Sequence, residues 1–144
     1  MRWSKTFSDI VSLTAGVRQG GVLSPLLFSA YIDVILSELE KSNCGCFINS
    51  KCFNSFLYAD DLILVSISVI DLQLLLDKCS QIFKSLDLQI NASKTNCLRI
   101  GPKYRSFCNP IFLNDLALEW VKEARYLGVF IKSGLKFSCN WHSA

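Results

Sequence analysis

Two adjacent carboxylates interrupt one of the most apolar stretches of this 144-residue chain. They are Asp60 and Asp61, in the run NSFLYADDLILVS at residues 54–66. Burying an unpaired carboxylate is costly, and two side by side also repel each other. Aspartate favours turns, so a hairpin turn would account for one of them. A divalent cation such as Mg²⁺, which prefers carboxylate oxygen, would account for both. The residues by themselves leave these two interpretations open.

The residues on either side of the aspartates predict the element that positions them. Aromatic and branched side chains flank Ala59, which indicates two strands joined as a hairpin. Neighbouring side chains of a regular strand point to opposite faces, but at a hairpin tip both carboxylates can reach one solvated cleft. A short strand at about residues 44–49, with a turn near Asn49, is expected to precede this hairpin.

Two segments with helical spacing of apolar residues surround the hairpin. The first helix is expected at about residues 25–41, with Ser24 as its N-cap and Pro25 in its first turn. The second is expected at about residues 71–86, with Asp71 as its cap. Residues 88–101 predict strand, turn and strand, residues 110–132 predict short strands, and the first thirteen residues predict one more. Together they predict an α+β fold, with helices packed on a mainly antiparallel sheet.

The composition limits the class of protein. Apolar residues make up 51% of the chain and charged ones 19%, which excludes a disordered chain and suggests that a neighbour covers some apolar surface. The net charge of +3 permits contact with nucleic acid without indicating it. The basic groups at residues 99–105 and 122–125 are interpreted as solvated faces. Charged residues interrupt the apolar stretches, so we expect no membrane span, and MRWSKTFSDI is not a secretory signal.

The cysteine pattern favours a reducing compartment. The chain has seven cysteines, an odd number, and none forms a C-x-x-C pair. We therefore expect small buried hydrophobic residues with free thiols rather than zinc ligands or disulfides. This predicts an intracellular protein, cytoplasmic or nuclear. The cysteines are Cys44, Cys46, Cys52, Cys79, Cys97, Cys108 and Cys139.

Several motifs together resemble those of one enzyme family. YADD at residues 58–61 lies inside an apolar hairpin, GVRQGGVLSP at 16–25 precedes a helix, and LQINASKTNCL at 88–98 and RYLGV at 125–129 follow in order. This set, over about residues 14–131, resembles reverse transcriptases. Arg18 directly before Gln19 in the second motif resembles the form of that motif in the non-LTR (LINE-like) retrotransposon enzymes. The resemblance implies the palm subdomain of an RNA-directed DNA polymerase with a catalytic YADD hairpin. It also implies two-metal nucleotidyl transfer with Mg²⁺, or with Mn²⁺.

The resemblance also implies roles for individual residues. Asp60 and Asp61 would be the catalytic metal ligands, with Asp61 holding an ion or orienting the primer end. Tyr58 and Ala59 would lie beside the primer terminus; ordinary hairpin packing is the alternative. Lys94 would be a catalytic residue near the incoming triphosphate that donates a proton to pyrophosphate; the alternative is a solvated turn lysine. The nucleotide and template pocket would be lined by Arg18, Gln19, Gly20 and Gly21.

The remaining implications concern the primer and the extent of the domain. Leu127 and Gly128 match the primer-grip region, where we expect packing more than chemistry. The family's first catalytic Asp strand has no counterpart here, because only Asp9 precedes Gly16. Residues 1–144 are thus expected to be a partial domain without the fingers and most of the thumb. We expect this chain to be inactive alone; the intact enzyme would use an RNA template, a DNA primer and dNTPs. The alternative is a non-catalytic remnant or a small nucleic-acid-binding module.

Overall fold

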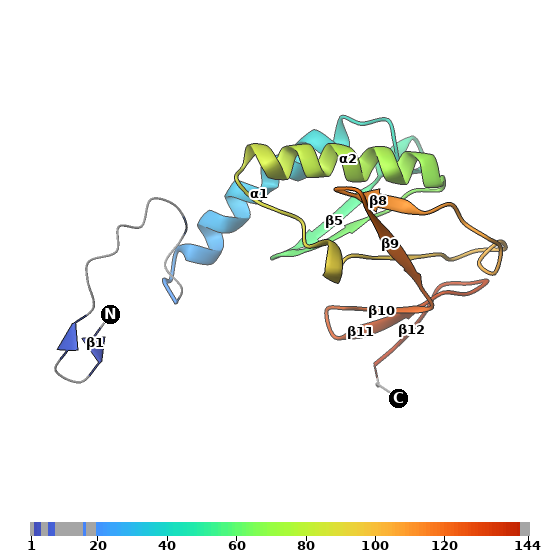
Figure 1. Cartoon of the computed structure of the whole chain (residues 1–144). Coiled ribbons are helices and arrows are strands. Elements are labelled where there is room, and N and C mark those ends of the chain that lie inside the picture. Colours follow the sequence, from blue (N-terminus) through green and yellow to red (C-terminus); the bar gives the residue numbers. More distant parts are fainter. Residues whose placement is uncertain (1, 4–5, 8–15, 17–19, 142–144) are drawn as a thin grey trace.

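The computed structural model describes residues 2–3, 6–7, 16 and 20–141 (Figure 1). Its helical elements are α1 (Ser24–Glu40), α2 (Val69–Ser85) and the short 3₁₀ helix η1 (Ala92–Lys94). The strands are β1 (Arg2–Trp3), β2 (Thr6–Phe7), β3 (Cys46–Ile48), β4 (Lys51–Phe53), β5 (Ser55–Tyr58), β6 (Asp61–Leu64), β7 (Asn96–Leu98), β8 (Ile111–Leu113), β9 (Leu116–Val121), β10 (Glu123–Tyr126), β11 (Val129–Lys132) and β12 (Ser138–Asn140). The α+β class is confirmed.

Both predicted helices are present, but their caps differ from the prediction. In α1, Ser24 is already helical and the N-cap is Leu23, whose carbonyl accepts a 3.0 Å bond from the Leu27 amide. Helical bonding therefore extends one residue further than expected. In α2, the cap is Ser68, whose hydroxyl accepts a 3.4 Å bond from the Asp71 amide. Asp71 thus lies in the first turn, where its negative charge favours the helix dipole.

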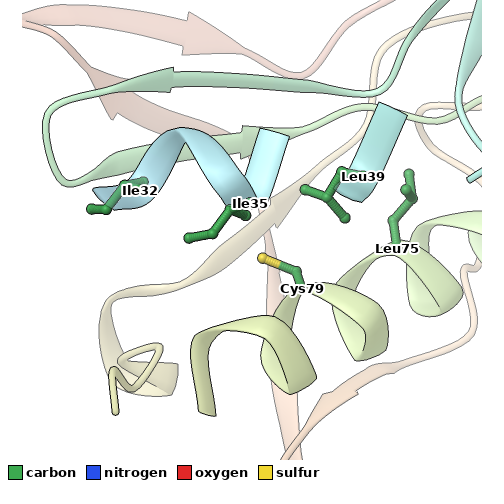
Figure 2. Packing of buried hydrophobic residues seen from close by; sticks show 5 residues of the cluster. All are labelled: Ile32, Ile35, Leu39, Leu75 and Cys79. Atoms are coloured by element: carbon green, nitrogen blue, oxygen red, sulfur yellow. The ribbon is translucent and has the colours of Figure 1, made fainter. Parts of the chain in front are cut away.

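The main core lies between the two helices and the β5–β6 hairpin. Figure 2 shows the side chains of Ile32, Ile35 and Leu39 on α1 facing those of Leu75 and Cys79 on α2. Their spacing of three and four residues places each set on one helix face. Ile35, Leu39 and Cys79 are completely buried. The hairpin closes this core with the partly buried side chains of Leu57, Leu62 and Leu64.

A second core lies on another side of α2. Leu76 belongs to it, while the adjacent Leu75 belongs to the first core. Its partners are buried residues of β7, β8 and β9, namely Cys97, Ile111, Leu113 and Leu118. Because one helix serves both cores, α2 holds the hairpin and the β7–β9–β8 sheet in a fixed relation.

The strands do not form the single sheet that was predicted. Within the described ranges they form five small sheets: β1–β2, β3–β4, β5–β6, β7–β9–β8 and β10–β11–β12. The pairing is antiparallel except between β7 and β9, which are parallel. The individual strands are short, with two to six residues. The strand expected just after residue 88 is also absent: residues 88–91 are unpaired and lead directly into η1.

The cysteines are free, but most are not buried. All seven are unpaired thiols in the structure. Only Cys79 and Cys97 are buried; Cys139 is exposed and the other four are intermediate, so the interpretation as buried hydrophobic residues holds for two. Burial raises the pKa of Cys79 to about 12 and that of Cys97 to about 11.

A large apolar surface remains exposed at the start of α1. Leu23, Leu26 and Leu27 are each more than half exposed, and Val22 is 95% exposed. In Figure 1 this half of α1 projects away from the layer that α2 covers. No described residue covers these side chains, in keeping with the expected uncovered apolar surface. None of the described helices has the length and hydropathy needed to cross a bilayer.

Candidate functional site

The two aspartates lie at the tip of the β5–β6 hairpin. Tyr58 and Asp61 form the last residue pair of the ladder, and Ala59 and Asp60 make the two-residue turn. Ala59 has a φ of 51°, a conformation that suits glycine at this position of a hairpin turn and strains an alanine. The chain therefore reverses direction sharply between Tyr58 and Asp61.

The hairpin separates an apolar face from a polar one. The pair Leu57–Leu62 faces the helices, because both side chains pack against the main core. The alternating pair Tyr58–Asp61 must face the opposite side. Tyr58 is 63% exposed there, and Asp60 and Asp61 are exposed as well. The apolar run thus packs its leucines against the core while both carboxylates stay in solvent, which avoids the cost of burying the carboxylates.

A buried contact that the sequence did not indicate fixes the base of this hairpin. Asn54, which is 3% exposed, directly precedes β5. Its side-chain nitrogen Nδ2 donates to the Leu39 carbonyl at 2.6 Å and to the Ser42 hydroxyl at 3.3 Å. It thereby joins the end of α1 to the start of β5. Gly45 lies against it: a Cβ on Gly45 would be 2.7 Å from the Asn54 Cβ.

The segment Asn91–Thr95 forms a self-locked turn that presents Lys94 to solvent. The Asn91 side-chain oxygen accepts bonds from the Ser93 amide at 3.0 Å and the Ser93 hydroxyl at 2.7 Å. The Thr95 hydroxyl donates to the Asn91 carbonyl at 2.8 Å. Asn91 and Thr95 therefore shape the turn, and Lys94 is left exposed at its end.

This turn is tied to the hairpin through the core. Ile90, immediately before it, packs against the same main core as Leu57 and Leu62. An open depression of about 490 Å³ adjoins the turn and is lined by residues 89–93 and Leu116. Within the part of the chain that the structure describes, Lys94 makes no ion pair with Asp60 or Asp61. The structure brings its segment beside the hairpin without direct contact between these charges.

The other predicted residues lie at different places. Gly20 has a φ of 78° and is exposed, so glycine suits its backbone conformation; the Gly21 carbonyl accepts from the Ser24 amide at 3.2 Å. Arg18 and Gln19, like Asp9, lie outside the described residues. Leu127 and Gly128 form the β10–β11 turn, with φ angles of 48° and 81°. Both are exposed in this turn.

The donor set at the tip suits a hard cation only in part. Two carboxylates at successive positions supply oxygen ligands of the kind that Mg²⁺ prefers. Among the described residues, no group of three Asp, Glu, His or Cys side chains could hold a metal ion. Mg²⁺ is commonly held by one or two carboxylates together with water and substrate phosphates. The tip can thus provide part of such a site.

Comparison with known proteins decides the family. The family model for reverse transcriptase (RNA-dependent DNA polymerase) matches residues 4–131, nearly the whole chain. The chain belongs to the reverse transcriptase family. The hairpin, the Asn91–Thr95 turn and the β10–β11 turn all lie within the matched residues.

Relatives of this reverse transcriptase chain come from non-LTR retrotransposons. It is 29% identical to the Pol polyprotein of the type-2 retrotransposable element R2DM of Drosophila melanogaster, over 87% of this chain and 12% of that protein. It is 32% identical to the transposon TX1 149 kDa protein of Xenopus laevis, over 92% and 10%. It is 35% identical to an R2 element Pol polyprotein of Bradysia coprophila, over 84% and 14%. The chain is thus a non-LTR reverse transcriptase fragment that spans about a tenth of these relatives.

Proposed function

We propose that this chain is the palm portion of an RNA-directed DNA polymerase, with its catalytic centre at the β5–β6 tip. The observation that carries the proposal is the exposed pair Asp60–Asp61, held on a core-anchored hairpin within a chain of this family. A mobile loop would not fix two carboxylates in this way. Here Leu57 and Leu62 pack against the helices, so the tip is positioned by the core.

In this proposal the carboxylates of Asp60 and Asp61 hold Mg²⁺, or Mn²⁺, in the assembled enzyme. When bound there, such ions would supply positive charge for activating the attacking primer oxygen and for stabilising the leaving pyrophosphate. The protein's own part is positional: the turn sets Asp60 at the tip and the ladder sets Asp61 on the open face beside Tyr58. Tyr58 and Ala59 would border the primer terminus on that face.

The other motif residues act on the nucleotide and the nucleic acid. Lys94 is presented by a locked turn, and its ammonium would meet the incoming triphosphate. Arg18, Gln19, Gly20 and Gly21 would line the nucleotide and template pocket. The β10–β11 turn with Leu127 and Gly128 would contact the primer strand. The exposure of Leu127 leaves it available for that contact.

The chain by itself is proposed to be inactive. It supplies two catalytic carboxylates, Asp60 and Asp61, whereas the family's centre uses a further Asp from another strand. RNA template, DNA primer and dNTPs would bind to the complete domain, with fingers and thumb, in the cytoplasm or nucleus. Positioning of the reactants can supply roughly 7–11 kcal/mol of catalysis. Loss of the surrounding subdomains would remove much of that contribution.

Titration with Mn²⁺ tests the site on the chain as it stands. Bound Mn²⁺ is followed by loss of the free-ion electron paramagnetic resonance signal. We expect weak binding that Asp60→Asn and Asp61→Asn each reduce by roughly ten-fold or more, as for loss of groups at a metal site. Asp115→Asn is the control, because Asp115 is also an exposed carboxylate in a two-residue turn. Equal binding by all variants would refute a metal site at the hairpin tip.

A further inference from the structure

Two segments far apart in the sequence form one surface at the edge of the molecule. They are residues 99–107 and 132–137, called here the loop surface. The Gly101 amide donates to the Gly134 carbonyl at 2.8 Å, and the Ser133 hydroxyl donates to the Arg99 carbonyl at 2.7 Å. Ile100 and Gly134 also form an isolated β-bridge. These bonds hold the two segments side by side, at the right-hand edge of Figure 1.

The loop surface carries a net positive charge. Residues 99–110 and 130–141 contain five Lys or Arg residues and no Asp or Glu. One of the five, Lys132, pairs with Glu123 at 3.2 Å. Lys103, Arg105 and Lys136 are exposed and make no ion pair with any described residue. The cations thus stand out from a chain whose whole net charge is only +3.

Aromatic rings lie among these cations. Phe107 is 89% exposed and Phe137 is 65% exposed, so both rings are open to a binding partner. The Arg105 guanidinium lies 5.1 Å from the centroid of the Tyr104 ring, so this pair presents a cation above an aromatic face. Solvated lysines would explain the charge but not the exposed phenylalanines between them.

We propose that the loop surface binds single-stranded nucleic acid. Unpaired bases offer flat faces that stack on exposed aromatic rings, and their phosphates complement the cations. In a duplex the bases are stacked on one another. A duplex could therefore bind the cations but could not stack on the aromatic rings. In Figure 1 the loop surface lies at the right-hand edge, whereas the β5–β6 turn lies near the middle of the picture. It is therefore separate from the proposed catalytic tip, and also from the β10–β11 turn at Leu127.

Fluorescence anisotropy with labelled 20-nucleotide oligouridylate and oligothymidylate measures this binding on the full chain. The test variant replaces Lys103, Arg105 and Lys136 by Ala, and the control replaces Lys51, Lys78 and Lys84, on β4 and α2, by Ala. Both variants remove three positive charges, and circular dichroism checks their folding. If the test variant fails to fold, the exposed single change Lys103→Glu replaces it.

The salt dependence of the affinity gives the sharpest readout. The slope of log K against log salt is negative. Loss of three phosphate contacts is expected to reduce its magnitude by about 2, at roughly 0.7 per contact for single strands. The control should leave that slope nearly unchanged. Phe107→Ala and Phe137→Ala should each weaken binding by roughly five-fold or more without changing the slope, because stacking carries no counterion release. We expect similar affinities for oligouridylate and oligothymidylate, because stacking does not read the 2′-hydroxyl.

Several results would overturn the proposal. Equal weakening by the test and control variants would show only general attraction, and stronger binding to a 20-base-pair duplex would exclude stacking. Absence of binding at 50 mM salt, or preference for an acidic peptide of equal charge, would also contradict it. The loop surface and the hairpin tip consist of different residues. Failure of the loop surface therefore does not bear on the catalytic tip, and failure of the tip does not bear on the loop surface.

Discussion

Ala59 shows how one residue shapes the hairpin tip. Its positive φ costs an L-amino acid about 1–2 kcal/mol, whereas glycine adopts it freely but loses more entropy on folding. We therefore predict that Ala59→Gly stabilises the fold by up to about 1 kcal/mol. Chemical denaturation monitored by circular dichroism measures this change. Destabilisation by more than 1 kcal/mol would show that the methyl group makes a favourable contact at the tip.

Gly45 and Gly101 form a matched pair for testing the clamp below the hairpin. Both have positive φ, at 144° and 122°, but a Cβ on Gly45 would meet Asn54 at 2.7 Å while one on Gly101 would meet nothing within 4 Å. Gly45→Ala should therefore destabilise the chain by at least about 1 kcal/mol more than Gly101→Ala, which tests backbone strain alone. Urea unfolding of both variants provides the comparison. Equal losses would refute the steric role of Gly45.

Asn54 itself supplies the polar half of this clamp. Asn54→Ala removes two hydrogen bonds to the end of α1, at Leu39 and Ser42. We predict a loss of about 1–2 kcal/mol in the free energy of unfolding. Asn96→Ala, on an exposed residue of β7, should change it by less than about 0.5 kcal/mol. A neutral Asn54→Ala would show that solvent replaces these bonds without cost.

At the scale of elements, the Asn91–Thr95 turn depends on one acceptor. Asn91→Ala removes the oxygen that holds the Ser93 amide and hydroxyl, whereas Asn91→Asp keeps such an oxygen. We expect Asn91→Ala to cost about 1 kcal/mol and Asn91→Asp to cost little. Thermal unfolding of the two variants measures the difference. If both variants lose equal stability, the amide rather than the oxygen holds the turn.

Local patterns predicted the elements better than their assembly. The apolar spacing after Pro25 and after Asp71 indicated both helices, because each has a strongly buried face. The unpaired segment at residues 88–91 was expected to be a strand, since Leu88 and Ile90 alternate with polar residues. Both side chains instead pack against the main core before Asn91 begins a tight turn. The contact between Gly45 and Asn54 was also missed, because it joins segments through tertiary packing that no short pattern records.

The candidate site was predicted to a similar extent. The turn-prone pair Asp60–Asp61 between apolar runs indicated a hairpin tip, which the residue pairing shows. The sequence did not indicate that the Tyr58–Asp61 pair faces away from the helices, because that depends on which hairpin face packs on the core. It also did not indicate that Leu127 lies in a turn with two positive φ angles, where its side chain is 48% exposed.

At the scale of the whole molecule, burial divides the cysteines into reactive and protected groups. At pH 8, native-state alkylation followed by mass spectrometry should label Cys139 first and Cys79 and Cys97 last, because burial raises the pKa of these two thiols. After unfolding under non-reducing conditions all seven should be labelled. Fast labelling of Cys79 in the native chain would contradict the described core.

The same two thiols give the fold a pH dependence. In the unfolded chain a cysteine ionises near 9.0, while the buried Cys79 keeps its proton up to about 12. The folded state therefore binds more protons above pH 9, and its stability falls as the pH rises from 9 toward 12. Denaturation midpoints measured at pH 8, 9.5 and 10.5 should decrease in that order. A midpoint that is constant over this range would contradict the burial of these thiols.

Primer extension is the measurement that tests the central claim most directly. A domain with this chain's residues 16–131, and upstream and downstream segments from an R2 relative, is compared with the chain alone on a poly(rA) template with Mg²⁺ or Mn²⁺. We predict extension by the longer protein only, reduced about a hundred-fold or more by Asp60→Asn and unchanged by Asp115→Asn. Extension by the chain alone, or full activity of the Asp60→Asn domain, would contradict a catalytic centre at the hairpin tip that needs the rest of the domain.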